Sequence, residues 1–295
     1  MNGDPLRGPA ALMFLILACA SSPAPQPQAK ACDSALPGGA TTTRARLVAV
    51  KGKIMSADYR ADLEALARGR DEALACANDT ELGYLAHYWA GYASWRAAMN
   101  GANRHMKRDD LVANLQRARA DFETSLSQRS DSADAYAAAA SVNGWLGGFF
   151  LGDRNVAREH FDRSSRFLSR ALELEPANPR VMWVEAGDFL FRPLKMGGDP
   201  PKAIEIYRHA IATAPEPDGA SPLPDWGKPE CLMALAFAHL NSPSTDAAAA
   251  AKEAREALRM QPDWSYVRDI LLPQIEKARR FAQPTIKAQA ASSSR

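Results

Sequence analysis

The feature that most constrains this fold is a short run of helix-forming residues that stops at a proline and recurs along the chain. It is clearest in ALELEP at 171–176, returns in AIATAP at 210–215 and ALRMQP at 257–262, and is weaker in SLSQRS at 125–130. Proline lacks a backbone N–H and clashes with the preceding helical turn, so each proline predicts a helix end. The second proline of the ALELEPANPR stretch, Pro179, predicts the start of the next helix.

Side chains at regular spacing accompany each copy. A bulky or apolar residue precedes each copy by three positions, and a small one lies four residues earlier. These residues are Phe122, Leu168, Tyr207 and Ala254, with Ala118, Ser164, Ala203 and Ala250. Further small residues recur at nearly even intervals, namely Gly91, Ala140, Gly187 and Ala236. Because small side chains let helix backbones approach closely, the pattern predicts an array of helical hairpins.

Composition agrees with this pattern. Hydrophobic residues make up 46% of the 295 residues, and alanine, leucine, arginine and glutamate are more frequent than β-branched residues. The chain is therefore expected to be all-α. A formal net charge of +2 gives no electrostatic sign of nucleic-acid binding.

Residues 80–262 resemble the tetratricopeptide repeat (TPR) family, and the third copy matches best. Its matching residues are Trp183, Gly187, Ala203, Tyr207, Ala210 and Pro215. The resemblance implies a right-handed superhelical array of antiparallel helix pairs, with about four repeats longer than the usual length of about 34 residues. It also implies a groove that binds another protein. The asparagine and lysine with which some members bind chaperone tails are absent, so that activity is not expected.

Helices are expected to cover both ends of the array. The N-terminal segment, 32–79, contains a predicted capping helix at 57–76 in which Gly69 is the expected weak point. The C-terminal capping helix, 263–281, has one apolar face, and the tail at 282–295 is expected to be disordered. That face consists of Trp264, Val267, Leu271 and Ile275.

The N-terminus predicts export. The apolar run at 10–18 is too short to span a bilayer, so 1–18 is interpreted as a signal peptide and 19–31 as a flexible tether. Residues 16–19 resemble a bacterial lipobox, which would make Cys19 a lipidated first residue of a periplasmic, membrane-anchored lipoprotein. A small-x-small cleavage pattern at 18–20 is the alternative. A disulfide between Cys32 and Cys76 is expected, or else both are small buried residues, whereas Cys231 is interpreted as packing.

Four longer connections are predicted, at 99–110, 144–154, 192–199 and 215–229. Their tryptophans, Trp145 and Trp226, either line a pocket or clamp a peptide, or else fold back over the array. The candidate contacts in the groove are Asn143, Trp145, Asp188, Arg192, Trp226, His239 and Asn241.

No catalytic motif or metal-ligand spacing is present, so no enzyme, cofactor or metal is expected. The sequence favours an exported scaffold that binds another envelope protein or peptide, with membrane contact only through a lipid anchor. The alternative, suggested by resemblance to TPR lipoproteins of TRAP-type transport systems, is a carrier or accessory protein for a small ligand. An intracellular adaptor is a third interpretation.

Overall fold

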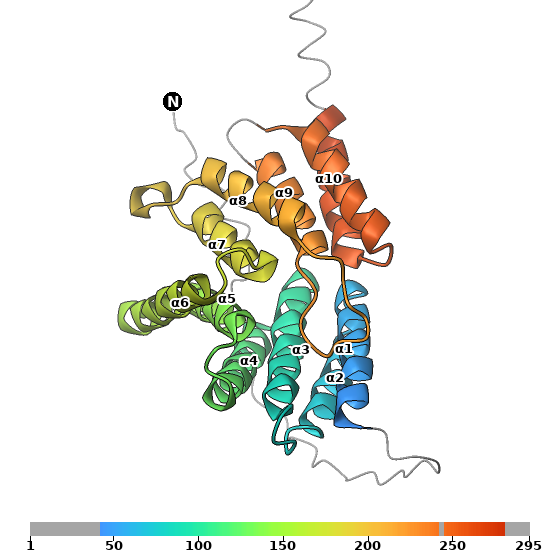
Figure 1. Cartoon of the computed structure of the whole chain (residues 1–295). Helices are drawn as coiled ribbons and strands as arrows, with labels where there is room; N and C mark the ends of the chain where they lie inside the picture. The colour runs from blue at the N-terminus through green and yellow to red at the C-terminus, as the bar shows by residue number, and fades with distance from the viewer. Residues whose placement is uncertain (1–41, 242–244, 281–295) are drawn as a thin grey trace, which may run out of the picture.

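The computed structural model describes residues 42–241 and 245–280, which contain helices and turns and no strand. The prediction of an all-α chain is confirmed (Figure 1). In chain order the helices are α1 (Thr43–Tyr59), α2 (Leu63–Leu74), α3 (Gly83–Asn103), α4 (Arg108–Gln128), α5 (Ala133–Phe149), α6 (Arg154–Leu174), α7 (Pro179–Phe191), the 3₁₀ helix η2 (Leu194–Met196), α8 (Pro200–Thr213), α9 (Lys228–Asn241), α10 (Ala247–Met260) and the π-helix η3 (Tyr266–Leu271).

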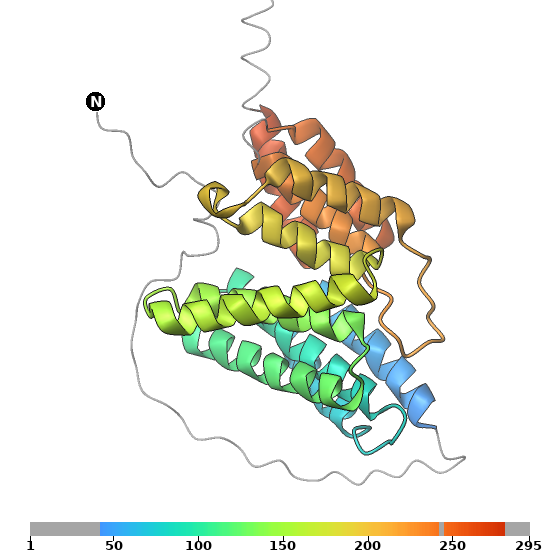
Figure 2. The same ribbon diagram turned by 60° about the vertical axis from the view of Figure 1, so that its left-hand side comes forward.

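Consecutive helices pack as pairs that run in opposite directions (Figures 1 and 2). The pairs are α1 with α2, α3 with α4, α5 with α6, α7 with α8, and α9 with α10. The first helices of neighbouring pairs also contact one another, from α1 to α3 and on to α5, α7 and α9. The second helix of each pair also packs on the first helix of the next, as α2 does on α3 and α4 does on α5, so both helices of a pair join it to its neighbour.

The small residues predicted from spacing lie where paired helices meet. A Cβ on Gly91 would stand only 3.0 Å from the ring of Phe122 on α4, so glycine allows this close approach. In the next pair, Ser164 donates a hydrogen bond to the carbonyl of Ala140 at 2.8 Å. The spacing pattern thus identified true helix contacts.

The helix ends follow the proline pattern. Helix α6 ends at Leu174, ahead of Pro176, and α7 begins at Pro179 as predicted. The Asn178 side chain caps α7 by accepting a hydrogen bond from the backbone N–H of Arg180 at 3.0 Å. Helices α8 and α10 likewise end shortly before a proline.

The N-terminal capping segment differs from the prediction. Two helices, α1 and α2, replace the single helix expected at 57–76, and the chain turns between them at Ala61, whose φ is 53°. Gly69 does not interrupt the helix. It lies inside α2, where a Cβ would stand 2.6 Å from Cγ1 of Ile54, so its absent side chain lets α2 pack against α1.

The C-terminal segment packs as predicted. The four residues of its apolar face are at most 1% exposed, namely Trp264, Val267, Leu271 and Ile275. The Trp264 ring meets the ring of Tyr59 at the end of α1, with 5.0 Å between centroids. The first pair of helices therefore contacts the last part of the described chain.

Candidate functional site

Asn143 is buried, so its expected role as a surface contact is corrected. It lies on α5 and is 0% exposed. Its Nδ2 donates to the carbonyl of Ala139 at 2.9 Å, and its Oδ1 lies 3.2 Å from Nδ1 of His160 on α6. The amide links two paired helices instead of facing a partner.

Trp145 also lies on a helix, because α5 continues to Phe149 through most of the connection predicted at 144–154. Gly144 and Gly147 in this part of α5 face α6. A Cβ on Gly147 would stand 2.7 Å from the ring of Phe161 on α6. Trp145 is partly buried against the hydrophobic core, so it is not a loop residue that could clamp a peptide.

Trp226 is the clearest correction, since it is only 2% exposed. Its Nε1 donates to the hydroxyl of Tyr88 at 2.9 Å, and its ring centroid lies 5.9 Å from that of Trp95 and 5.8 Å from that of Trp183. The proline-rich connection folds back and places this indole in the aromatic centre of the molecule. The tryptophan of this connection therefore folds back over the array and does not line an open pocket or clamp a peptide.

The segment that carries Trp226, residues 214–227, is here called the crossing segment. Figure 1 shows it in orange, running from α8 alongside α1 and α3 to α9. Lys51 on α1 donates to the carbonyl of Asp218 at 3.0 Å and to Oδ2 of Asp225 at 2.7 Å. Trp89 on α3 donates to the carbonyl of Pro222 at 2.8 Å. The crossing segment thus joins the first two pairs to α9.

Beneath it lies a buried polar network that the sequence patterns missed. Arg96 pairs with Asp58 at 2.7 Å, while Glu230 accepts hydrogen bonds from the Tyr59 hydroxyl and the Gly227 N–H, each at 2.7 Å. Burial raises the pKa of Glu230, against the opposing effect of these donors and of the Arg96 charge. The sequence feature that could have indicated this network is a single charged residue within an otherwise apolar helical run, as in YASWRAAM and PECLMAL.

Besides Trp145, three of the predicted contact residues are partly exposed, and they lie at the ends of the neighbouring first helices α7 and α9. Asp188 and Arg192 form an ion pair at the end of α7, and Asn241 ends α9 with its Nδ2 on the carbonyl of Phe237 at 2.9 Å. Between them, Phe191 is 46% exposed and its ring centroid lies 5.8 Å from that of Phe237. These five residues are here called the α7–α9 face.

His239 on α9 does not contribute to the surface of this face, because only 6% of it is exposed. Its Nδ1 lies 2.7 Å from Oε2 of Glu253 on α10, and its Nε2 faces Arg208 on α8 at 3.3 Å. Burial raises the pKa of Glu253, which its contact with His239 opposes. The expectation that His239 meets a partner directly is therefore corrected.

Close to the face, Glu185 precedes Asp188 by one helical turn on α7. Burial raises its pKa, and the positive charge of Lys202 opposes that shift. Lys202 itself lies over the ring of Phe189, with Nζ 3.9 Å from the centroid. Lys202 on α8 therefore provides a positive charge near Glu185 and over the Phe189 ring of α7.

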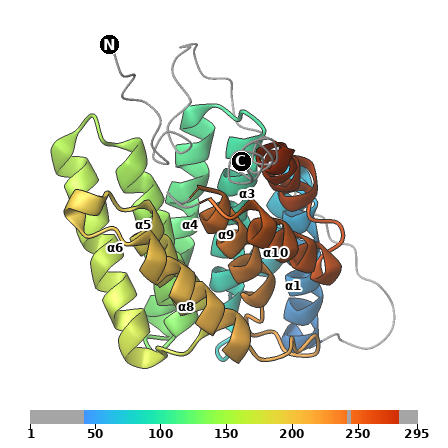
Figure 3. The same cartoon turned by 90° about the horizontal axis from the view of Figure 1, so that it is seen from above.

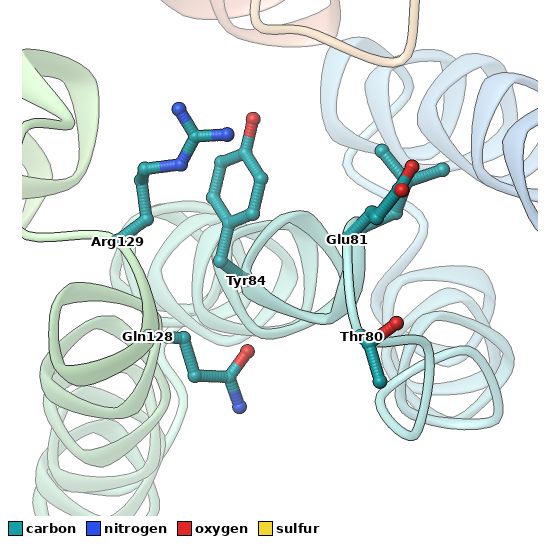
Figure 4. A pocket seen from close by; sticks show the side chains of 6 residues that line it. Thr80, Glu81, Tyr84, Gln128 and Arg129 are labelled. Carbon is teal, nitrogen blue, oxygen red and sulfur yellow. The ribbon is translucent and has the colours of Figure 1, made fainter.

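Two of the hollows on the described surface lie at the helices near the N-terminus of the described chain. One, of about 320 Å³, is lined by the start of α3 and the end of α4, where the Arg129 guanidinium lies 4.7 Å from the centre of the Tyr84 ring (Figure 4). The other, of about 480 Å³, lies between α1 and α2 and is lined by Lys53, Arg68 and Glu72 among others. Neither contains a predicted contact residue.

Within residues 42–241 and 245–280, no group of three or more His, Cys, Asp or Glu residues is placed to hold a metal ion. In the same ranges, no helix has both the length and the hydropathy to cross a bilayer. The signal peptide, Cys19, the tether, Cys32 and the C-terminal tail lie outside the described residues. Cys76 is 4% exposed, and its disulfide with Cys32 stays a prediction.

Comparison with known proteins identifies no family. No protein-family model matches the chain, and no curated protein matches it. A solved structure, that of the HusA haemophore from Porphyromonas gingivalis, is similar with a TM-score of 0.49 and 21% identity, covering 67% of this chain and 94% of the haemophore chain. This likeness is too distant to assign a function.

Proposed function

We propose that this chain is a non-enzymatic, exported scaffold that binds another protein of the bacterial cell envelope through the α7–α9 face. Its helix pairs form a right-handed superhelical array of the tetratricopeptide type, and a lipid on Cys19 anchors it to a membrane. The sequential packing of helix pairs supports the array. The signal-peptide pattern supports export.

One observation carries the proposal, which is the exposed Phe191 ring beside the partly buried Phe237 ring on the α7–α9 face. Phe191 is 46% exposed although Phe237 packs beside it, and the ion pair of Asp188 with Arg192 flanks it. An aromatic centre with a polar rim is typical of protein interface hot spots. Because both rings sit on packed helices, binding orders few side chains and so loses little conformational entropy.

The small-ligand alternative lacks comparable support. It relied on Trp145 and Trp226 as loop residues, but the first packs on the core from a helix and the second is 2% exposed. The polar residues of the α7–α9 face suit a protein surface better than an enclosed apolar ligand.

Site-specific photo-crosslinking in a homologous host tests the proposal. A benzophenone side chain at Phe191 is expected to crosslink a discrete envelope protein. Phe161 on α6 is the matched control, since it is an aromatic residue with 42% exposure outside the face. Crosslinks that are the same at both positions, or absent from 191, would contradict the proposal.

A binding measurement with the captured partner completes the test. Phe191→Glu should weaken the complex by tenfold or more, because truncating an interface hot spot costs about 2 kcal/mol or more. Phe161→Glu should leave the affinity unchanged. Equal losses in both variants would show that the α7–α9 face is not the binding surface.

A further inference from the structure

Some of the most exposed apolar side chains of this molecule lie at two neighbouring turns. Within the described residues, three of the six large exposed apolar side chains lie in the α5–α6 and α7–α8 turns. They are Leu194, 70% exposed, Met196, 64%, and Leu151, 52%. The other three lie outside these turns, Phe161 on α6, Phe191 at the end of α7 and Leu223 on the crossing segment.

These turns lie on one side of the molecule. Figure 2 shows the α5–α6 turn and the η2 turn both at the left, and the view from above agrees (Figure 3). The α3–α4 turn joins them through Arg108, which donates to the carbonyl of Phe149 at 2.5 Å and lies 5.6 Å from the centre of the Phe150 ring. We call residues 104–108, 150–154 and 193–198 the turn edge.

Positive charge accompanies the apolar side chains there. The turn edge holds five lysine or arginine residues and one acidic residue. The cations are Arg104, Lys107, Arg108, Arg154 and Lys195. The acidic residue, Asp153, accepts hydrogen bonds from the N–H groups of Asn155 and Val156, so the N-terminus of α6 offsets its charge. Three further acidic residues lie just outside the turn edge, each near a helix N-terminus, namely Asp109 and Asp110 in the first turn of α4 and Asp199 at the N-cap of α8.

The shape of the turn edge decides what it can contact. Its apolar side chains project from separate turns, and they line neither of the two hollows described above. A bound peptide or rigid protein needs a continuous complementary surface, whereas fluid lipid accommodates separate apolar projections. Lysine and arginine beside such projections can reach lipid phosphates while their stems stay in the apolar layer.

We infer that the turn edge docks on an anionic bilayer surface, with Leu151, Leu194 and Met196 inserted at the boundary between headgroups and acyl chains. The lysine and arginine side chains of the turn edge bind the lipid phosphates. This contact goes beyond the proposed function and uses none of the residues of the α7–α9 face.

Fluorescence quenching by brominated lipids tests this inference in the full-length chain. In a Cys19→Ser, Cys32→Ser background, one dye is attached through Leu194→Cys or, as the matched control, Leu223→Cys. The remaining cysteines, Cys76 and Cys231, are 4% and 0% exposed and so are shielded from labelling. Vesicles of phosphatidylcholine, with and without phosphatidylglycerol, are then added.

The dye at 194 should be quenched, more strongly with phosphatidylglycerol, while the dye at 223 should not. Adding Lys107→Glu and Lys195→Glu should raise the lipid concentration for half-quenching about tenfold or more. Equal quenching at both positions, or none at 194, would overturn the inference. The inference would also be overturned if lipid left the fluorescence of the dye at 194 unchanged while an envelope protein shielded the dye. The turn edge would then be a protein interface.

Discussion

At the scale of single residues, buried charge distinguishes this interior from an ordinary apolar helix core. Glu230 is 0% exposed and is held by two donors, Tyr59 and the Gly227 N–H. A carboxylate in such a place is tolerated because each of its oxygens is hydrogen-bonded. It also makes stability depend on pH.

Glu230→Gln should reveal that dependence. Burial raises the folded-state pKa of Glu230 above its ordinary value of 4.5, so the folded protein holds the proton more tightly than the unfolded chain does. The stabilisation is therefore fully present below pH 4.5 and is lost as the pH rises through the folded-state pKa. Urea titrations measure the free energy of unfolding of the original chain and of Glu230→Gln. The value for the original chain minus the value for the variant should fall as the pH is raised from 4.5 to neutrality.

The exposed Glu64→Gln variant controls for loss of a carboxylate. A difference for Glu230→Gln that increases with pH, or one that matches Glu64→Gln at every pH, would contradict this prediction.

At the scale of elements, the turn between α1 and α2 is under backbone strain. Ala61 has a φ of 53°, in the left-handed region that costs a residue with a Cβ about 1 kcal/mol. Ala61→Gly should therefore raise the free energy of unfolding by about 0.5 kcal/mol, after the loss of one buried methyl group. Thermal unfolding followed by circular dichroism measures the change.

Ala65→Gly provides a control of opposite sign inside α2. It should lower the free energy of unfolding by about 1 kcal/mol, since glycine is a poor helix former. If Ala61→Gly destabilises the protein as much as Ala65→Gly, the strain assigned to this turn is wrong.

The elements also show what the sequence could and could not predict. Helix ends and small packing positions were predicted correctly because proline and 3.6-residue periodicity act locally. The glycines at 144 and 147 were misread as loop signals, since a single sequence does not distinguish glycine in a turn from glycine under a neighbouring ring such as Phe161. The sequence alone did not place Trp226, because several of the residues around it, among them Tyr88, lie more than a hundred positions away along the chain.

At the scale of the whole molecule, Lys51 is the main link between α1 and the crossing segment. The Lys51 side chain is 4% exposed and that of Asp225 13%. Lys51→Met should lower the free energy of unfolding by about 3 kcal/mol or more, because it leaves a largely buried carboxylate without its cation. Chemical denaturation measures the loss, and hydrogen exchange should show faster opening of α1.

Lys53→Met is the matched control two residues away. Lys53 pairs with Glu72, but their side chains are 61% and 43% exposed, so its loss should cost less than about 1 kcal/mol. Similar losses in the two variants would mean that the crossing segment contributes little to holding the first pair.

The crossing segment has a consequence for how such a chain can evolve. Open repeat proteins gain and lose units by duplication and deletion, since each unit meets only its neighbours. Here Lys51 in the first pair binds Asp225, which immediately precedes the last pair. Inserting or removing one pair would separate these two residues and uncover Trp226. A change in the number of pairs between α1 and α9 would therefore break contacts that a substitution on the surface leaves in place.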